Sequence, residues 1–150
     1  MASELAKGIM EVAVFLRFLE ASHLPIYRNS VEKRFPPEPD ILCTHQSEGA
    51  VAFELVEMCD SRLASSIAKA SDGYLRTSDP SPNIMSKELR KKYETDVQIE
   101  LLCYTAGRIV TPDDVILQMI KLYLRTWRHT FRRAWLLGRK GGVYVVWGAN

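Results

Sequence analysis

The apolar run AVAFELVEMC, residues 50–59, is the stretch that most constrains the fold. It has the length of a β-strand, and no apolar run in the chain reaches the roughly 18 residues of a membrane-spanning helix. Alternation along a strand places Phe53 and Leu55 on one face and Glu54 on the other. A buried carboxylate without a partner costs several kcal/mol. We therefore expect Glu54 to be paired, exposed or bound to a cation.

The rest of the chain alternates between helical and strand-like patterns, and a length of 150 residues suits a single domain over residues 1–150. The periodicity predicts a helix over 3–22, strands over 26–34, 39–44 and 50–59, helices over 61–70 and 86–93, a strand over 97–104, a helix over 111–130, and a hairpin over 131–138 and 142–148. The Ser-, Asp- and Pro-rich segment 71–85 predicts a loop. The expected fold is therefore a mixed β-sheet flanked by helices, in the α/β class at its border with α+β.

Within the first helix, apolar residues recur at helical spacing and predict the buried stripe. They are Leu5, Ile9, Val12, Leu16 and Leu19. Glu4, Lys7 and Glu11 interrupt the apolar character that a secretory signal would need. We therefore expect this helix to belong to the mature fold. At the other helix, 111–130, Thr111 is expected as the N-cap and Pro112 as the first helical residue.

Three cysteines, Cys43, Cys59 and Cys103, have no close spacing and are odd in number. This predicts buried free thiols in a reducing cytoplasm rather than a disulfide framework. Cys43 and His45 form a C-x-H pair that could suggest zinc, but two further ligands at metal-site spacing are missing.

Asp40 follows Pro39 at the start of the strand that precedes the Glu54 strand, so the two carboxylates could lie close together. Two carboxylates suit Mg²⁺ or Mn²⁺, which keep waters and bind phosphate oxygens as their other ligands. Such a metal activates water and stabilises a transferring phosphoryl group. The alternative is that Asp40 is a turn residue and Glu54 an edge-strand acid in contact with water.

The pairing of Pro39-Asp40 with Glu54-Leu55-Val56 resembles the signature of the PD-(D/E)XK nuclease superfamily, which has the restriction-endonuclease-like fold. The expected element order is also similar to that family's αβββαβ core and would cover about residues 3–104, followed here by a further helix and a β-hairpin. The resemblance implies catalytic and metal-binding roles for Asp40 and Glu54, with Mg²⁺ or Mn²⁺ as cofactor. It also implies a metal-binding glutamate on the first helix, which would be Glu20 or Glu11.

The family's motif lysine is replaced here by Val56. Because related nucleases can recruit that lysine from a neighbouring element, the resemblance implies Lys69 as the first candidate and Lys33 as the second. Gln98 and Glu100 on the next strand could complete the cluster. Without a lysine the site would be a degenerate metal site with no activity.

Basic residues gather in the last part of the chain. Residues 1–107 carry 12 Lys and Arg against 16 Asp and Glu, whereas residues 108–150 carry 8 against 2. This asymmetry indicates either a surface for a polyanion or chance. The residues expected to contact DNA or RNA phosphates are Lys121, Arg125, Arg128, Arg132 and Arg133. The alternative is a solvated helix face with extended arginines.

Three functions follow from these patterns. The first is a metal-dependent nuclease acting on nucleic-acid phosphodiesters. The second is a non-catalytic module of the same fold that binds nucleic acid or protein. The third is a structural domain that forms a homodimer through pairing of the hairpin 131–148 with a second copy.

Overall fold

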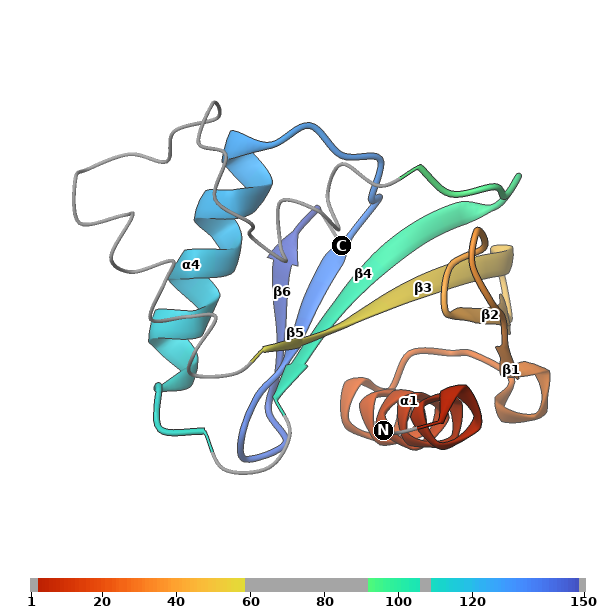
Figure 1. Ribbon diagram of the computed structural model, residues 1–150, viewed down its shortest axis with the longest axis horizontal. Helices are drawn as coiled ribbons and strands as arrows, with labels where there is room; N and C mark the ends of the chain where they lie inside the picture. The colour runs from red at the N-terminus through yellow and green to blue at the C-terminus, as the bar shows by residue number, and fades with distance from the viewer. Residues whose placement is uncertain (1–2, 59–91, 106–108, 149–150) are drawn as a thin grey trace.

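The computed structural model describes residues 3–58, 92–105 and 109–148, and within them it is an α+β protein with one six-stranded mixed sheet (Figure 1). The elements are α1 (Glu4–Ser22), the 3-10 helix η1 (Arg28–Ser30), β1 (Glu32–Lys33), β2 (Ile41–His45), β3 (Gly49–Met58), β4 (Gln98–Thr105), α4 (Asp113–Thr126), β5 (Ala134–Leu137) and β6 (Val143–Trp147).

The strands lie side by side in the order in which they occur in the chain. β1, β2 and β3 form an antiparallel meander, β3, β4 and β5 run parallel, and β6 returns antiparallel to β5. Parallel neighbours need a crossover connection, and α4 lies in the crossover from β4 to β5. The crossover from β3 to β4 runs through residues 59–91, which lie outside the described residues.

Apolar side chains cover both faces of the sheet, with α1 on one face and α4 on the other (Figure 1). Under α1, the rings of Phe15 and Phe18 pack on Phe53 at centroid distances of 4.8 and 5.9 Å, and Phe18 meets Trp135 at 5.5 Å. Under α4, Ile116, Ile120 and other residues of the helix pack against β3, β4 and β5. The central strands β3 and β4 are therefore buried on both sides.

The stripe predicted for α1 is wrong in part. Leu5 and Ile9 are 74% and 64% exposed, and the helix instead buries a face that includes Gly8, Glu11 and Phe15. The helix is apolar on several faces, so its periodicity alone could not select one. The packing of two phenylalanine rings on Phe53 decides the orientation.

Several predicted elements are confirmed with small changes at their ends. The helix of residues 3–22, the strands near 39–44, 50–59 and 97–104, and the terminal hairpin are all present. The helix predicted over 111–130 is shorter: Pro112 itself is the N-cap, with no side-chain cap hydrogen bond, and the chain becomes extended at Trp127. The predicted Thr111 cap is therefore wrong.

The strand predicted over 26–34 is also largely wrong, because most of it is the 3-10 helix η1 followed by the two-residue strand β1. Ile26 makes only an isolated bridge to His45. The helix predicted over 61–70 and the loop over 71–85 lie outside the described residues, as does most of 86–93. The αβββαβ core therefore stays a prediction, although the order of the described elements agrees with it. No helix within the described residues is long and apolar enough to cross a membrane.

The packing of Phe53 predicts a large effect on stability. Phe53 is 1% exposed beneath two phenylalanine rings. We expect Phe53→Ala to lower the free energy of unfolding by about 3–5 kcal/mol, because it removes buried apolar area and leaves a cavity. The matched control is Phe35→Ala, since Phe35 is 55% exposed and should cost about 1 kcal/mol or less. Urea denaturation followed by circular dichroism measures both, and similar losses would contradict this account of the core.

Candidate functional site

Asp40 and Glu54 lie together where β2 begins beside β3, as their order in the sequence predicts. The backbone N–H of Asp40 donates to Glu54 Oε1 at 3.1 Å, and the N–H of Leu55 donates to Asp40 Oδ2 at 2.9 Å. The last paired residues of the two strands are Ile41 and Phe53. Glu54 thus accepts a backbone hydrogen bond from Asp40, and Asp40 accepts one from the residue after Glu54. Both bonds lie just beyond the last paired residues of β2 and β3, and together they fix the two side chains.

Glu54 is only 3% exposed, and it shares its face of β3 with Ala52 and Val56, which pack on the α4 side of the sheet. The second oxygen of its carboxylate accepts a hydrogen bond of 2.9 Å from the Tyr93 hydroxyl. Tyr93 lies just before β4, and its segment is tied to the loop before Asp40 by a 3.1 Å hydrogen bond from the Glu94 N–H to the Pro37 carbonyl. The expectation that Glu54 has a partner is confirmed, but no pattern in the sequence pointed to Tyr93.

Lys33 supplies a cation next to Asp40. Its Nζ lies 3.2 Å from Asp40 Oδ1 and 3.0 Å from Glu11 Oε1, and its side chain is 18% exposed. The stem of Lys33 crosses α1 at Gly8, where an added Cβ would lie 3.4 Å from Lys33 Cγ. A Cβ at that distance would be in ordinary van der Waals contact, so the lysine stem packs closely on this turn of α1. The Phe35 ring lies on the other side, with its centroid 5.5 Å from Nζ.

The charges in this cluster are unequal, with one cation close to two carboxylates. Burial, and then the charge of Asp40, raise the pKa of Glu11 above its ordinary value of 4.5 even though Lys33 opposes this shift. Burial would lower the pKa of Lys33, but Asp40 and then Glu11 outweigh it and raise that pKa above 10.5. Lys33 is therefore held firmly as an ammonium ion, and Glu11 is the acid whose charge is disfavoured. The 3.0 Å ion pair with Lys33 Nζ partly compensates the charge of the buried Glu11.

The helix glutamate of this cluster is Glu11 and not Glu20. Glu20 is 80% exposed and pairs with Arg28 at 3.6 Å, and it lies about 13 Å further along the helix axis than Glu11. The predicted role of Glu20 as a metal ligand is therefore not supported by its placement. The first-ranked lysine, Lys69, lies outside the described residues, whereas the second, Lys33, contacts Asp40. The hairpin register pairs Lys33 with Ile41, the residue after Asp40, and that pairing is the signal that could have ranked Lys33 first.

Glu100 is not an open ligand beside Asp40 and Glu54. It is 3% exposed on the α1 side of β4, the opposite face from Glu54. It accepts hydrogen bonds from Arg132 Nη2 at 2.5 Å and from Trp135 Nε1 at 2.8 Å. Gln98, the other residue expected to complete the cluster, is exposed at the start of β4.

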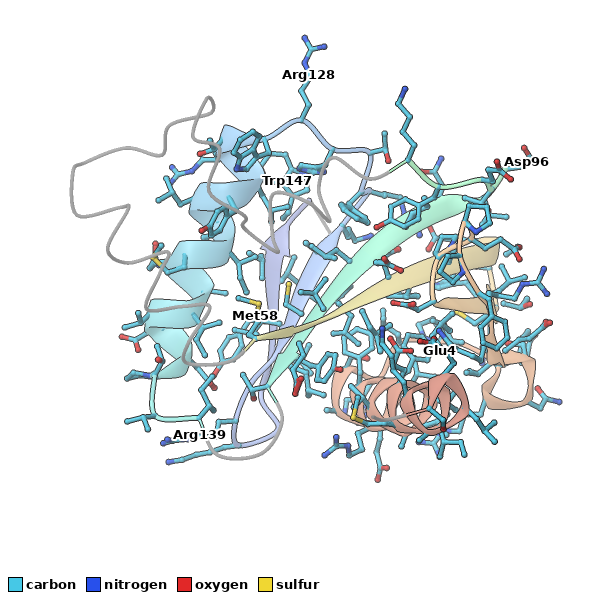
Figure 2. The ribbon with its side chains drawn as sticks, viewed as in Figure 1. Glu4, Met58, Asp96, Arg128, Arg139 and Trp147 are labelled. Atoms are coloured by element: carbon cyan, nitrogen blue, oxygen red, sulfur yellow. The ribbon has the colours of Figure 1, made fainter. Side chains whose placement is uncertain are left out.

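The five cations predicted to bind nucleic acid do not form one helix face. Lys121 and Arg125 are on α4, whereas Arg128 follows its end and points outward (Figure 2). Arg132 and Arg133 precede β5 and pair with acids of the same chain. Arg132 lies 3.0 Å from Glu48, Arg133 lies 3.3 Å from Glu48, and both also approach Glu100. A buried glutamate on β4 requires this compensation, so these two arginines have a structural role whatever else they contact.

The prediction that the cysteines are buried is confirmed for the two that the structure describes. Cys43 is a buried free thiol, Cys103 is buried, and Cys59 lies outside the described residues. Burial, and then the charge of Glu100, raise the pKa of Cys43 to about 12. The ring of His45 caps the β2–β3 turn, with Nδ1 accepting from the Ser47 N–H at 3.2 Å. This geometry gives the Cys43-x-His45 pair a structural explanation.

No group of three or more His, Cys, Asp or Glu side chains suited to a metal ion occurs within residues 3–58, 92–105 and 109–148. Asp40 and Glu54 remain a pair of carboxylates on adjoining segments, which fits only the mode in which a hard cation takes one or two carboxylates and several waters. No family model, curated protein or solved structure matches this chain. The described residues therefore define an α+β protein with a mixed sheet and a buried acid–lysine cluster, and its function has to be inferred from that cluster.

Removing the Lys33 charge should destabilise the protein in a pH-dependent way. A native carboxyl with a raised pKa binds its proton more tightly than in the unfolded chain, so the stability that depends on Glu11 falls as the pH rises from 4.5 through the native pKa. Lys33→Met would enlarge this penalty. We expect it to lower the free energy of unfolding by about 2–3 kcal/mol at pH 8, because it leaves Glu11 and Asp40 uncompensated, and by clearly less at pH 5.

Urea denaturation at the two pH values measures this effect. Lys140→Met, at an exposed lysine in the β5–β6 turn, is the control. An equal loss from Lys33→Met at both pH values would mean that the lysine stem, rather than its charge, stabilises the fold.

The raised pKa of Cys43 predicts slow alkylation. With a pKa of about 12, only about 10⁻⁴ of this thiol is ionised at pH 8, and the thiolate is the reactive form. We expect iodoacetamide to leave Cys43 unmodified in the native protein while it fully modifies the same residue in urea. Peptide mapping by mass spectrometry separates Cys43 from the other two cysteines. Native labelling at the denatured rate would show that β2 opens readily.

Proposed function

We propose that Glu11, Lys33, Asp40 and Glu54 form a divalent-cation-dependent site that hydrolyses nucleic-acid phosphodiesters, as the resemblance to PD-(D/E)XK nucleases implies. The observation that carries the proposal is the contact of Lys33 Nζ with Asp40 Oδ1 at 3.2 Å, next to the interlocked Asp40 and Glu54. It places a lysine beside the carboxylate pair although Val56 occupies the motif's lysine position.

In this proposal Asp40 and Glu54 would hold Mg²⁺ or Mn²⁺. When bound, such an ion activates water and stabilises the charge of the phosphoryl group. Glu11 is buried, and burial and then the charge of Asp40 raise its pKa above the ordinary value, so a further cation beside these acids would be favourable. Lys33, whose pKa is raised, would remain protonated and stabilise developing negative charge rather than remove a proton from water.

A second candidate function is a non-catalytic binding module. It is favoured by the hydrogen bonds and ion pairs that the site already contains. Both oxygens of Asp40 and both oxygens of Glu54 have a donor from the same chain. In that case Lys33 would serve as a permanent internal cation in place of a metal, and the cluster would stabilise the loop between β1 and β2.

Calorimetric titration with Mg²⁺ and Mn²⁺, with and without a single-stranded oligonucleotide, separates the two candidates. For the nuclease we expect saturable binding that is lost in Asp40→Asn and Glu54→Gln. Lys33→Met should retain binding but lower the rate of cleavage by about 10²–10³-fold, as loss of one stabilising charge at a transition state does. Glu20→Gln, an exposed acid on the same helix as Glu11, is the matched control and should change neither measurement.

Absence of metal binding in the wild-type protein, with nucleic acid present, would contradict the nuclease proposal and favour the binding module. Cleavage that persists in Asp40→Asn would place the active site elsewhere.

A further inference from the structure

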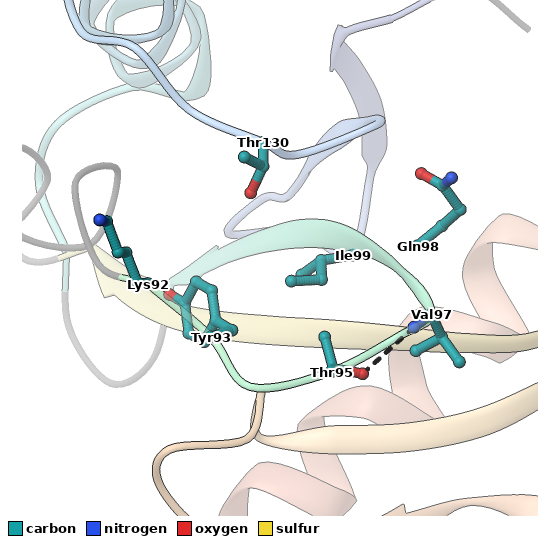
Figure 3. A pocket seen from close by; sticks show the side chains of 7 residues that line it. All are labelled: Lys92, Tyr93, Thr95, Val97, Gln98, Ile99 and Thr130. Carbon is teal, nitrogen blue, oxygen red and sulfur yellow. Dashed lines mark hydrogen bonds between the residues drawn. The ribbon is translucent and has the colours of Figure 1, made fainter.

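A pocket of about 500 Å³ lies next to Tyr93, a hydrogen-bond partner of Glu54, and is bounded by the segment that leads into β4 and by the loop after α4 (Figure 3). Its volume is within the range of about 300–1,000 Å³ typical of small-molecule sites. Tyr93 belongs to both sites, because its ring lines the pocket while its hydroxyl donates to Glu54 Oε2 at 2.9 Å. A ligand in this pocket would therefore lie one side chain away from the proposed catalytic carboxylates.

The lining combines an apolar wall with a polar rim. Tyr93, Val97 and the buried Ile99 provide the apolar surface. The Tyr93 ring packs against the ring of Phe131 in a tilted arrangement, with centroids 6.0 Å apart. Because Phe131 in turn contacts His129 at 5.8 Å, the ring is part of a packed aromatic group. A supported ring next to an open cavity is suited to stack on a planar ligand.

The rim supplies hydrogen-bonding groups and positive charge. The ammonium group of Lys92 lies at one end of the pocket and the amide of Gln98 at the other, with Thr130 above them (Figure 3). Arg128, two residues before Thr130, is exposed and points outward from the same loop. Lysine and arginine bind phosphate groups, and a glutamine amide can both donate to and accept from the edge of a base.

We propose that this pocket binds one unpaired nucleotide of a single-stranded nucleic acid, with the base on Tyr93 and its phosphates towards Lys92 and Arg128. The proposal rests on the proposed function for its biological meaning, since it assigns single strands as the substrate class of that site. A base inside a duplex is stacked on both sides and cannot enter a pocket of this size without being unstacked. The pocket therefore favours single strands over duplexes.

The test is binding of a short single-stranded oligonucleotide with one central 2-aminopurine, as DNA and as RNA, in EDTA so that no metal takes part. Stacking on Tyr93 should quench the 2-aminopurine fluorescence, and the same sequence as a duplex should bind at least about tenfold more weakly. We expect Tyr93→Leu to weaken single-strand binding about tenfold, whereas Tyr93→Phe, which keeps the ring but loses the hydroxyl, should bind within about twofold of wild type.

Lys92→Ala provides a second test at an exposed residue. It should lower the slope of log K against log salt by about 0.7, the value for one phosphate contact to a single strand. Lys140→Ala, an exposed lysine in the β5–β6 turn, is the matched control and should leave the slope unchanged.

Three results would each overturn the pocket proposal. They are equal affinities of Tyr93→Leu and Tyr93→Phe, a salt slope of Lys92→Ala equal to that of wild type, and no binding of either single strand. Its failure is distinguishable from failure of the nuclease proposal. If 2-aminopurine is quenched by the wild-type protein but no metal binds, the pocket stands and the hydrolytic site does not. If metal binds but the pocket variants do not change single-strand binding, the hydrolytic site stands and the pocket proposal does not.

Discussion

The structure depends on burying two central, mainly apolar strands that each carry a buried glutamate. β3 and β4 are covered on both faces, and each carries one glutamate that is 3% exposed. The register pairs Glu54 with Leu101 and Phe53 with Glu100, so the two glutamates point to opposite faces. A buried charge is tolerated only with hydrogen bonds and compensating partners. The segments around both strands are arranged to supply them: Tyr93 and the Asp40 backbone on one face, Arg132 and Trp135 on the other.

The two glutamates differ in how completely they are neutralised. Glu100 is held by an arginine and an indole N–H, whereas Glu54 is held by a hydroxyl and a backbone N–H, with Asp40 beside it. Lys33 is the cation close to Asp40, and it is shared with Glu11. The end of the sheet around β1, β2 and β3 is therefore richer in negative charge than the Glu100 side. That difference is why the proposed function is assigned to the Asp40 and Glu54 end.

The sequence predicted the central parts of the fold well and its surroundings less well. The alternation in residues 50–59 and the apolar run at 97–104 indicated the two central strands, because a buried strand leaves a pattern within a few residues. The paired acids Asp40 and Glu54 were also expected from their positions at neighbouring strands. The sequence did not predict that Glu11 rather than Glu20 joins the cluster, or that Tyr93 is the partner of Glu54. Both contacts depend on how distant segments pack. The prediction of the buried face of α1 was wrong in part for the same reason, since a helix that is apolar on several sides can pack in more than one orientation.

By itself, the sequence determined most of the described helices and strands, and that a carboxylate inside a buried strand must find a partner. These properties are local, because they follow from side-chain spacing and from the cost of removing a charge from water. Only the tertiary structure decided which partners those are. Lys33 reaches Asp40 across the β1–β2 pairing and over Gly8, and Arg132 reaches Glu100 from the segment before β5, 32 residues later. Such contacts are set by strand register and helix packing, which a pattern within one segment does not contain.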